Sequence, residues 1–228
     1  MPAGNAVPLC NNSSVQLRFL VPEDAPEVKR LCTEWFPIEY PDVWYKDITS
    51  NAKFFSLAAM YAGRIIGLIV AELKPQGQCN CEDAGLLDTQ FSPSAQVAYI
   101  LTLGVVRECR RNGIATLLLD SLLSHLSQAA TCKAVYLHVL ASNMCAIQFY
   151  ERRRFRLHAF LPLYYSVRGT PRDGYSYVLY LNGGHPPWTF LDYMKHWAHK
   201  VSQLQLCSLP KQIMRILGSL LCRAFAHS

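Results

Sequence analysis

A strand pattern that runs directly into a glycine turn is the feature that most constrains the fold of this chain. Residues 97–106 are almost continuously apolar, which is typical of a strand buried on both faces of a sheet. A basic turn at 110–113 follows, and residues 114–126 then carry a leucine or isoleucine at every fourth position, as one side of a helix requires. Backbone N–H groups in such a turn, together with the helix N-terminus, attract a pyrophosphate. The sequence therefore predicts a phosphate-bearing cofactor beside this strand.

The other patterns predict a mixed α/β domain over residues 15–185. Further strands are expected at 15–20, 54–61, 64–73, 134–140 and 175–181, and further helices at 22–32 and 142–150. Ala62-Gly63 is a hairpin-turn signal between two of these strands. We expect residues 1–14 to form a flexible tail and residues 74–95 a long loop.

The composition limits the functions that the chain can have. With 228 residues, of which 51% are hydrophobic, the chain is long enough for one domain with a full core. A net charge of +6 suits an anionic ligand or an anionic membrane surface, but the charges are too few and too scattered to indicate nucleic-acid binding.

The cysteines indicate free thiols rather than a disulfide framework. There are nine, an odd number, most of them lie inside apolar patterns, and no signal peptide precedes them. Cys79-Asn80-Cys81 has the wrong spacing for a zinc knuckle and no second pair accompanies it, so we expect no metal site. No cysteine has a motif or a neighbouring histidine that would mark a catalytic nucleophile.

Residues 186–228 differ in character from the domain before them. Residues 190–204 and 213–224 each carry an apolar helical stripe flanked by basic side chains, and Pro210 separates the two. Neither reaches the ~20 apolar residues that span a bilayer. Two short, basic, amphipathic helices favour an anchor lying in the membrane interface. The alternative is a pair of helices packed on the core or on a second subunit.

The glycine turn matches a known signature, Gln/Arg-x-x-Gly-x-Gly/Ala, with the residues Arg110-Arg111-Asn112-Gly113-Ile114-Ala115. The expected strand before the turn and the expected helix after it give the motif its usual context. In this the chain resembles the GCN5-related N-acetyltransferase (GNAT) superfamily. Within that family it is similar to the N-terminal acetyltransferases of the Golgi membrane, over about residues 15–225. The segments that carry this second likeness are 35–41, 45–51, 96–101, 136–140 and 182–188.

The resemblance implies a GNAT fold, which is a mixed central sheet with splayed central strands flanked by helices, followed here by C-terminal amphipathic helices. It implies direct transfer of acetyl from acetyl-CoA to the free α-amino group of proteins that begin with Met-Leu, Met-Ile, Met-Lys and similar pairs. The enzyme would lie on the cytosolic face of the Golgi membrane, held peripherally through residues 190–225. The family also forms weak homodimers through a loop near residues 162–173.

The chemistry needs one modestly placed base, because an α-amino group has a pKa near ~8. The resemblance implies that Tyr99 and His138 hold the water that takes the amine proton. From the residues alone, packing inside the core is the more common role for both side chains, and only the resemblance favours catalysis. Lysine ε-amines, including those of histone tails, are an alternative acceptor, and a non-catalytic acyl-CoA-binding membrane protein is an alternative of another class.

The resemblance also assigns the cofactor residues. The backbone of Leu103, Gly104 and Val105 would pair with the pantetheine arm. The pyrophosphate would be held by Arg111, Asn112, Gly113, Ile114, Ala115 and Thr116. Asn143 would bond the cofactor amide, and Tyr150 would lie near the sulfur as an acid for the thiolate, although an aromatic at a helix end also commonly packs on the sheet. We expect the basic run 152–154 to be a solvated face that attracts the cofactor phosphates.

The peptide is expected on the opposite side, against aromatic walls that suit an apolar first side chain such as methionine. The expected wall residues are Phe36, Pro37, Ile38, Glu39, Tyr40, Leu101, Tyr164 and Tyr165. For Tyr40 and Tyr165, simple loop packing is the alternative.

Overall fold

The computed structural model describes residues 15–36 and 40–188, together with residues 192, 194, 195, 197, 198 and 200. The chain divides into two units, Met1–Pro187 and Trp188–Ser228. The expected tail at 1–14 and three residues of the expected peptide wall, Pro37, Ile38 and Glu39, lie outside the described residues.

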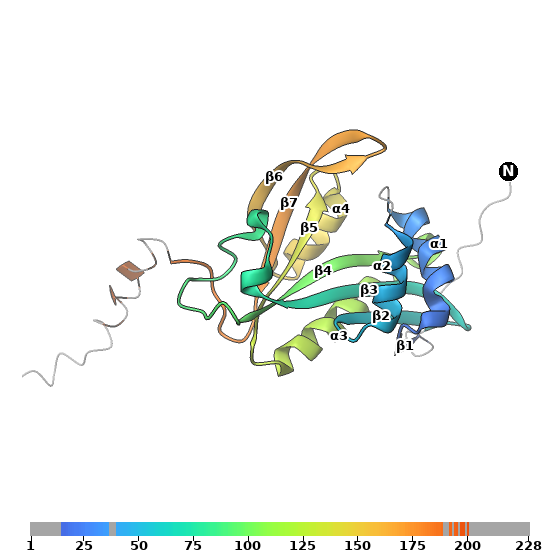
Figure 1. Ribbon diagram of the computed structural model, residues 1–228, viewed down its shortest axis with the longest axis horizontal. Coiled ribbons are helices and arrows are strands. Elements are labelled where there is room, and N and C mark those ends of the chain that lie inside the picture. Colours follow the sequence, from blue (N-terminus) through green and yellow to red (C-terminus); the bar gives the residue numbers. More distant parts are fainter. Residues whose placement is uncertain are drawn as a thin grey trace, which may run out of the picture. The chain divides into compact units, whose positions relative to one another are not determined.

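One mixed sheet forms the frame of the first unit (Figure 1). Its strands are β1 (Gln16–Phe19), β2 (Phe54–Tyr61), β3 (Arg64–Pro75), β4 (Gln96–Val105), β5 (Cys132–Leu140), β6 (Arg156–Val167) and β7 (Thr170–Tyr180). They lie in the order β1-β2-β3-β4-β5-β7-β6. All neighbours are antiparallel except β4 and β5, which are parallel and lie at the centre. This confirms the expected mixed α/β architecture.

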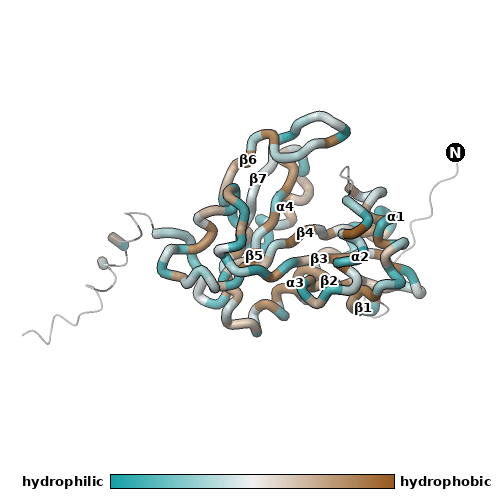
Figure 2. Tube along the Cα trace, in the orientation of Figure 1, coloured by the Kyte–Doolittle hydropathy of each residue, from teal (hydrophilic) through white to brown (hydrophobic). Residues whose placement is uncertain are grey.

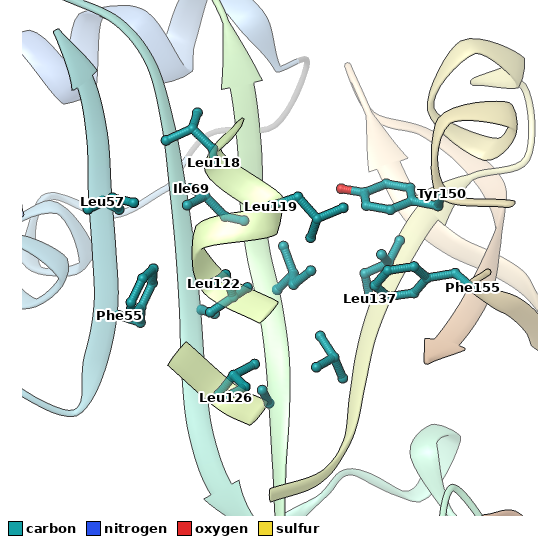
Figure 3. Packing of buried hydrophobic residues seen from close by; sticks show 14 of the residues in the cluster. Phe55, Leu57, Ile69, Leu118, Leu119, Leu122, Leu126, Leu137, Tyr150 and Phe155 are labelled. Carbon is teal, nitrogen blue, oxygen red and sulfur yellow. The ribbon is translucent and has the colours of Figure 1, made fainter. Parts of the chain in front are cut away.

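The helices cover the two faces of the sheet differently. They are α1 (Ala25–Trp35), α2 (Asp42–Ser50), α3 (Ile114–Gln128) and α4 (Met144–Arg152). On one face, α3 buries its leucine stripe against the strands, with Leu118, Leu122 and Leu126 fully covered (Figure 3). The α4 helix covers the same face and begins at Asn143, whose side chain accepts a hydrogen bond from the Ala146 N–H at 3.2 Å.

On the other face, α1 and α2 pack over β2 and β3, and the segment between β3 and β4 covers the rest. That segment is the expected long loop, with two short 3₁₀ turns at Gln76–Gln78 and Cys81–Asp83. It is not loose, because Leu86 and Leu87 are buried against β4, β5 and β7. Figure 2 shows the apolar stretches running along α3 and the central strands, with polar colours at the connections.

The two central strands pair only over their first halves. The pairing runs from Gln96 with Cys132 to Ile100 with Leu137, whereas β4 continues to Val105 and β5 to Leu140. A register shift in the β3–β4 ladder leaves Leu101 as an extra residue, which bends β4 where it leaves β5. The strands therefore splay apart, as the family resemblance implies, and the backbone of β4 beyond this point has no partner on the β5 side.

The structure corrects the expected order of elements in two places. No helix is expected from the sequence at 42–50, where α2 lies. The sequence predicts a single strand after α4, but β6 and β7 form a long hairpin. Tyr164 and Tyr165 therefore lie on β6 rather than in a loop, and 162–173 is the end of this hairpin. The alternation that marks a strand is broken in β6 by two register shifts, and Leu157, Phe160 and Leu163 are 55–68% exposed. The weak homodimer through this segment stays a prediction.

In the second unit, the six described residues beyond Trp188 are helical. Met194 and Trp197 are exposed, and the Lys200 ammonium lies 5.9 Å from the centre of the Trp197 ring. Within the described part of the chain, no helix has the length and apolar content needed to cross a bilayer. The rest of the two expected amphipathic helices lies outside the described residues.

Candidate active site

A groove of about 560 Å³ lies where β4 leads through the glycine turn into α3, with α4 as its other wall. Gly113 has φ +79° and Arg111 has φ +66°, so the turn uses left-handed backbone at two positions. At Gly113, which precedes the first residue of α3, the missing side chain also leaves the helix N-terminus open to a ligand.

The groove gathers nearly all of the cofactor residues expected from the sequence. Its walls include Leu103, Gly104, Val105, Arg111, Gly113, Ile114, Ala115, Thr116, Asn143 and Tyr150. Asn112 is not part of the lining, and its amide instead donates to the Arg110 carbonyl at 3.2 Å. The free edge of β4 runs along the groove, so Leu103, Gly104 and Val105 present backbone groups that an extended pantetheine arm can pair with.

Gly104 is required by packing as well as by the groove. A Cβ built at this position would lie 2.1 Å from Cε3 of Trp35, which is far inside van der Waals contact. The last residue of α1 therefore lies directly on the β4 backbone, and it brings the start of the 36–40 segment to the mouth of the splay.

Arginines make the groove basic, and sequence reasoning only partly anticipated them. Arg110, Arg152 and Arg153 line the groove as well as Arg111, whereas Arg154 of the expected basic face is exposed and outside the lining. The Arg153 guanidinium stacks 4.4 Å from the Phe149 ring centre and donates to the Thr116 hydroxyl, while its Nε has no protein partner. A planar, fixed guanidinium with a free N–H suits a phosphate group.

A second cavity of about 350 Å³ opens in the gap between the splayed strands. It shares Gly104, Asn143 and Tyr150 with the groove, so the two spaces adjoin. Its walls include Trp35, Phe36, Tyr40, Tyr99, Leu101, His138 and Tyr165. The structure therefore brings the described residues of the expected peptide wall to one place, except for Tyr164, which contacts His138 instead of lining the cavity.

His138 is the centre of a hydrogen-bonded group inside this gap. Its Nε2 lies 2.7 Å from Oδ1 of Asp83, and both side chains are at most 2% exposed. Its Nδ1 lies 3.1 Å from the Tyr99 hydroxyl and 2.7 Å from the Tyr164 hydroxyl. The Tyr99 ring is stacked on Tyr136 in the neighbouring strand, with 4.8 Å between the ring centres.

These contacts assign the state of the imidazole. A carboxylate only accepts hydrogen bonds, so Asp83 receives the Nε2–H of His138. In neutral histidine the other nitrogen then carries the lone pair, which makes Nδ1 an acceptor facing the two phenols. Burial raises the pKa of Tyr99 far above its usual value and also raises the pKa of Tyr164, so both phenols stay protonated. The arrangement is a base held in one tautomer, with its accepting nitrogen against two phenols, of which Tyr99 lines the gap.

Asp83 is the functional residue that sequence reasoning missed. It lies in the segment expected to be a long loop, and its contact with His138 joins residues 55 positions apart. The neighbouring Glu82 has the same charge, so the local pattern does not mark which carboxylate reaches the base.

On the opposite side of the sheet, Tyr150 is 7% exposed, and burial raises the pKa of its phenol. It therefore stays protonated, which fits the expected role as an acid at the leaving group.

Comparison with known proteins shows which family has this arrangement. The model of the acetyltransferase (GNAT) family matches residues 24–155, more than half of the chain. The chain belongs to the GNAT acetyltransferase family. This confirms the family expected from the glycine turn and its flanking strand and helix.

Relatives within the GNAT family are similar over nearly the whole chain. N-alpha-acetyltransferase 60 of Danio rerio is 54% identical over 219 residues, which cover 95% of this chain and 90% of that protein. N-alpha-acetyltransferase 60 of Xenopus tropicalis is 56% identical over 207 residues, covering 90% and 86%. The expectation of an N-alpha-acetyltransferase within the GNAT family is thereby confirmed.

Solved structures agree with the GNAT fold. Two crystal structures of Arabidopsis thaliana NAA60, one with a bisubstrate analogue and one with acetyl-CoA, superpose with TM-scores of 0.69 and 0.68. Each is 30% identical to this chain, and the alignment covers 74% of this chain and 99% of the Arabidopsis chain.

The six cysteines among the described residues are free, and burial raises the pKa of Cys32 to about 12 and that of Cys132 to about 11. Within the same residues, no three metal-ligating side chains come together.

Proposed function

We propose that the chain transfers the acetyl group of acetyl-CoA to the free α-amino group of proteins that begin with methionine. The observation that carries this proposal is the position of His138, a histidine paired with Asp83 that lines the gap adjoining the groove of the glycine turn. Acetyl-CoA supplies the activated thioester, and the arginines and the free β4 edge are the groups that would hold it.

The site has the parts for direct attack. Holding the amine and the thioester side by side removes about 7–11 kcal/mol of the barrier, so a covalent enzyme intermediate is not needed. The α-amino group has a pKa near ~8, so a neutral histidine is a sufficient base. Once His138 is protonated, the carboxylate of Asp83 stabilises the imidazolium. Tyr150, which lines both the groove and the gap, would donate a proton to the thiolate.

The walls of the gap favour a methionine side chain. Phe36, Tyr40 and Tyr165 are aromatic, and burial raises the pKa of Tyr40 to about 12, so its phenol is neutral and donates hydrogen bonds. A flexible thioether packs well against aromatic rings. The relatives more than half identical to this chain are N-alpha-acetyltransferases, which supports the α-amine over the lysine ε-amine as acceptor.

The acceptor is tested with two peptides of the same sequence, Met-Leu followed by an internal lysine, one with a free and one with a formylated N-terminus. We expect acetylation by acetyl-CoA of the free peptide at its α-nitrogen, with peptides starting Met-Lys also accepted. Acetylation of the formylated peptide at an equal rate would assign the enzyme to lysine instead. Product from neither peptide would refute acetyl transfer to proteins altogether.

We further propose that residues 190–225 hold the enzyme peripherally on the cytosolic face of the Golgi membrane. The two apolar stripes flanked by Lys, Arg and His support this, as do the exposed Met194 and Trp197. Basic amphipathic helices bind anionic lipid surfaces through apolar burial and charge together.

Deletion of residues 190–228 is expected to move the protein from the membrane to the soluble fraction of cells. Acetylation of free peptides by the truncated protein should stay within about twofold, because the catalytic group lies in the first unit. Binding of the full chain to vesicles with and without anionic lipid is the matched control. A truncated protein that still sediments with membranes would contradict the anchor.

A further inference from the structure

The outer strand of the hairpin is irregular at the point nearest to His138. Leu161 pairs with Gly174 and Tyr165 pairs with Arg172, so three residues of β6, 162–164, face the single residue Asp173 on β7. Within this bulge Leu163 has φ +54°, a left-handed conformation that is costly for a leucine. Bulges of this kind redirect side chains and are enriched beside active sites.

The bulge turns Tyr164 toward the base. The N–H of Leu163 donates to Oδ1 of Asp173 at 2.9 Å, which holds the irregular backbone in place. The next residue, Tyr165, packs against Gly174, where a Cβ would lie 2.9 Å from its ring. The Tyr164 ring lies edge-on to that of Tyr165, with 5.1 Å between the ring centres. Its ring centre is 4.7 Å from that of His138 and its hydroxyl is 2.7 Å from Nδ1.

Two phenols cannot both use the nitrogen. Nδ1 of neutral histidine has one lone pair in the ring plane, so it accepts one strong hydrogen bond at a time. The Tyr164 hydroxyl is the nearer, at 2.7 Å against 3.1 Å for Tyr99. The oxygen of a phenol that donates its proton still has lone pairs with which to accept another. The Tyr164 oxygen also has a hydrogen bond with Tyr99, which leaves one further lone pair to receive a proton beside His138 and Tyr99, both of which line the gap.

We propose that Tyr164 relays the proton of the attacking amine to His138, a role beyond that of a peptide wall. The inference rests on the proposed function. The amine arrives as its ammonium ion, one proton of which passes to the Tyr164 oxygen as the phenolic proton passes to Nδ1. The neutral nitrogen then bonds to the acetyl carbon, the bond from that carbon to sulfur breaks, and the second N–H proton goes to the departing thiolate. Tyr164 ends as a neutral phenol, His138 as an imidazolium paired with Asp83, and the sulfur leaves as the thiol of CoA.

The surroundings keep this phenol neutral. Burial raises the pKa of Tyr164, and the negative charges of Glu82 and Asp83 raise it further. A phenol that stays protonated can pass a proton on without accumulating as a phenolate.

Tyr164→Phe tests the relay, because it removes the hydroxyl and keeps the ring that a wall would need. At pH 7 we expect kcat for a Met-Leu peptide to fall about 10- to 100-fold. The KM of the peptide and the Kd of acetyl-CoA should stay within about twofold, since the ring and the groove are unchanged. Tyr175→Phe is the matched control, because its ring lies on the same hairpin beside Phe160 but packs on the α3 and α4 face of the sheet, opposite to the face of His138; it should leave kcat unchanged.

The pH profile separates a relay from a structural role. The loss caused by Tyr164→Phe should be about fivefold smaller at pH 9.5 than at pH 7, because above the pKa of the amine, near ~8, less proton transfer to the enzyme is needed. A second variant, Asp173→Ala, frees the Leu163 N–H that holds the bulge and should lower kcat about 3- to 10-fold with acetyl-CoA binding intact.

Three results would overturn the relay: wild-type kcat in Tyr164→Phe at pH 7, a loss that is the same at both pH values, or a rise in peptide KM alone. The proposed function fails separately, when the unmodified chain forms no product from the free peptide.

Discussion

Asp83→Asn is expected to lower kcat about 10²- to 10³-fold at pH 7. In the wild type, Asp83 accepts the Nε2–H of His138. The asparagine amide can instead donate to Nε2, and the imidazole proton would then move to Nδ1. Nδ1 would then face Tyr99 and Tyr164 without a lone pair, and the site would lose its base. The corresponding change in a serine-protease triad costs about 10⁴-fold for the same reason.

The Asp83→Asn measurement is steady-state kinetics with a Met-Leu peptide, alongside calorimetry with acetyl-CoA. The Kd of acetyl-CoA should stay within about twofold, because Asp83 is not part of the groove lining. Asp120→Asn removes an exposed carboxylate on α3 and is the matched control for the change in charge. A kcat within about fivefold of the wild type would show that Asp83 does not set the tautomer.

His138→Gln is expected to lower kcat about 10³-fold, since it removes the base itself. The glutamine amide can still donate to Asp83, so the buried carboxylate keeps a partner and the fold is preserved. The remaining rate reflects the placement of the amine beside the thioester, which does not depend on the base.

Combining the two substitutions gives a sharper result. If Asp83 acts only through His138, the double variant should be no slower than His138→Gln alone, because residues that act as one unit are not additive. A double variant slower by the product of the two single effects would mean that Asp83 acts on the reaction by another route.

The parts of the fold that the sequence predicts are those set by local pattern. The glycine turn, the α3 stripe and the Asn143 cap each depend on residues within a few positions of one another, and the structure has all three. The cofactor groove follows from them, because the turn and the helix N-terminus are adjacent in the chain. Only Asn112 of the expected set turns away, toward the Arg110 carbonyl.

The parts that sequence reasoning missed depend on contacts between distant segments. Asp83 reaches His138 across 55 positions, and nothing near it in the sequence indicates this. β6 has no clear alternation because two bulges interrupt its period. The same irregularity changes the interpretation of Tyr164, since a strand without the bulge would not direct that side chain to the base.

A crystal structure with a bisubstrate analogue, in which the acetyl group of CoA is joined to the nitrogen of a Met-Leu peptide, would show where the two substrates meet. We expect the pantetheine arm to lie along Leu103–Val105. We expect the peptide nitrogen to lie about 3 Å from the Tyr164 hydroxyl, or one water away from it or from His138 Nδ1. A nitrogen more than about 7 Å from both groups, with no water between, would contradict this expectation.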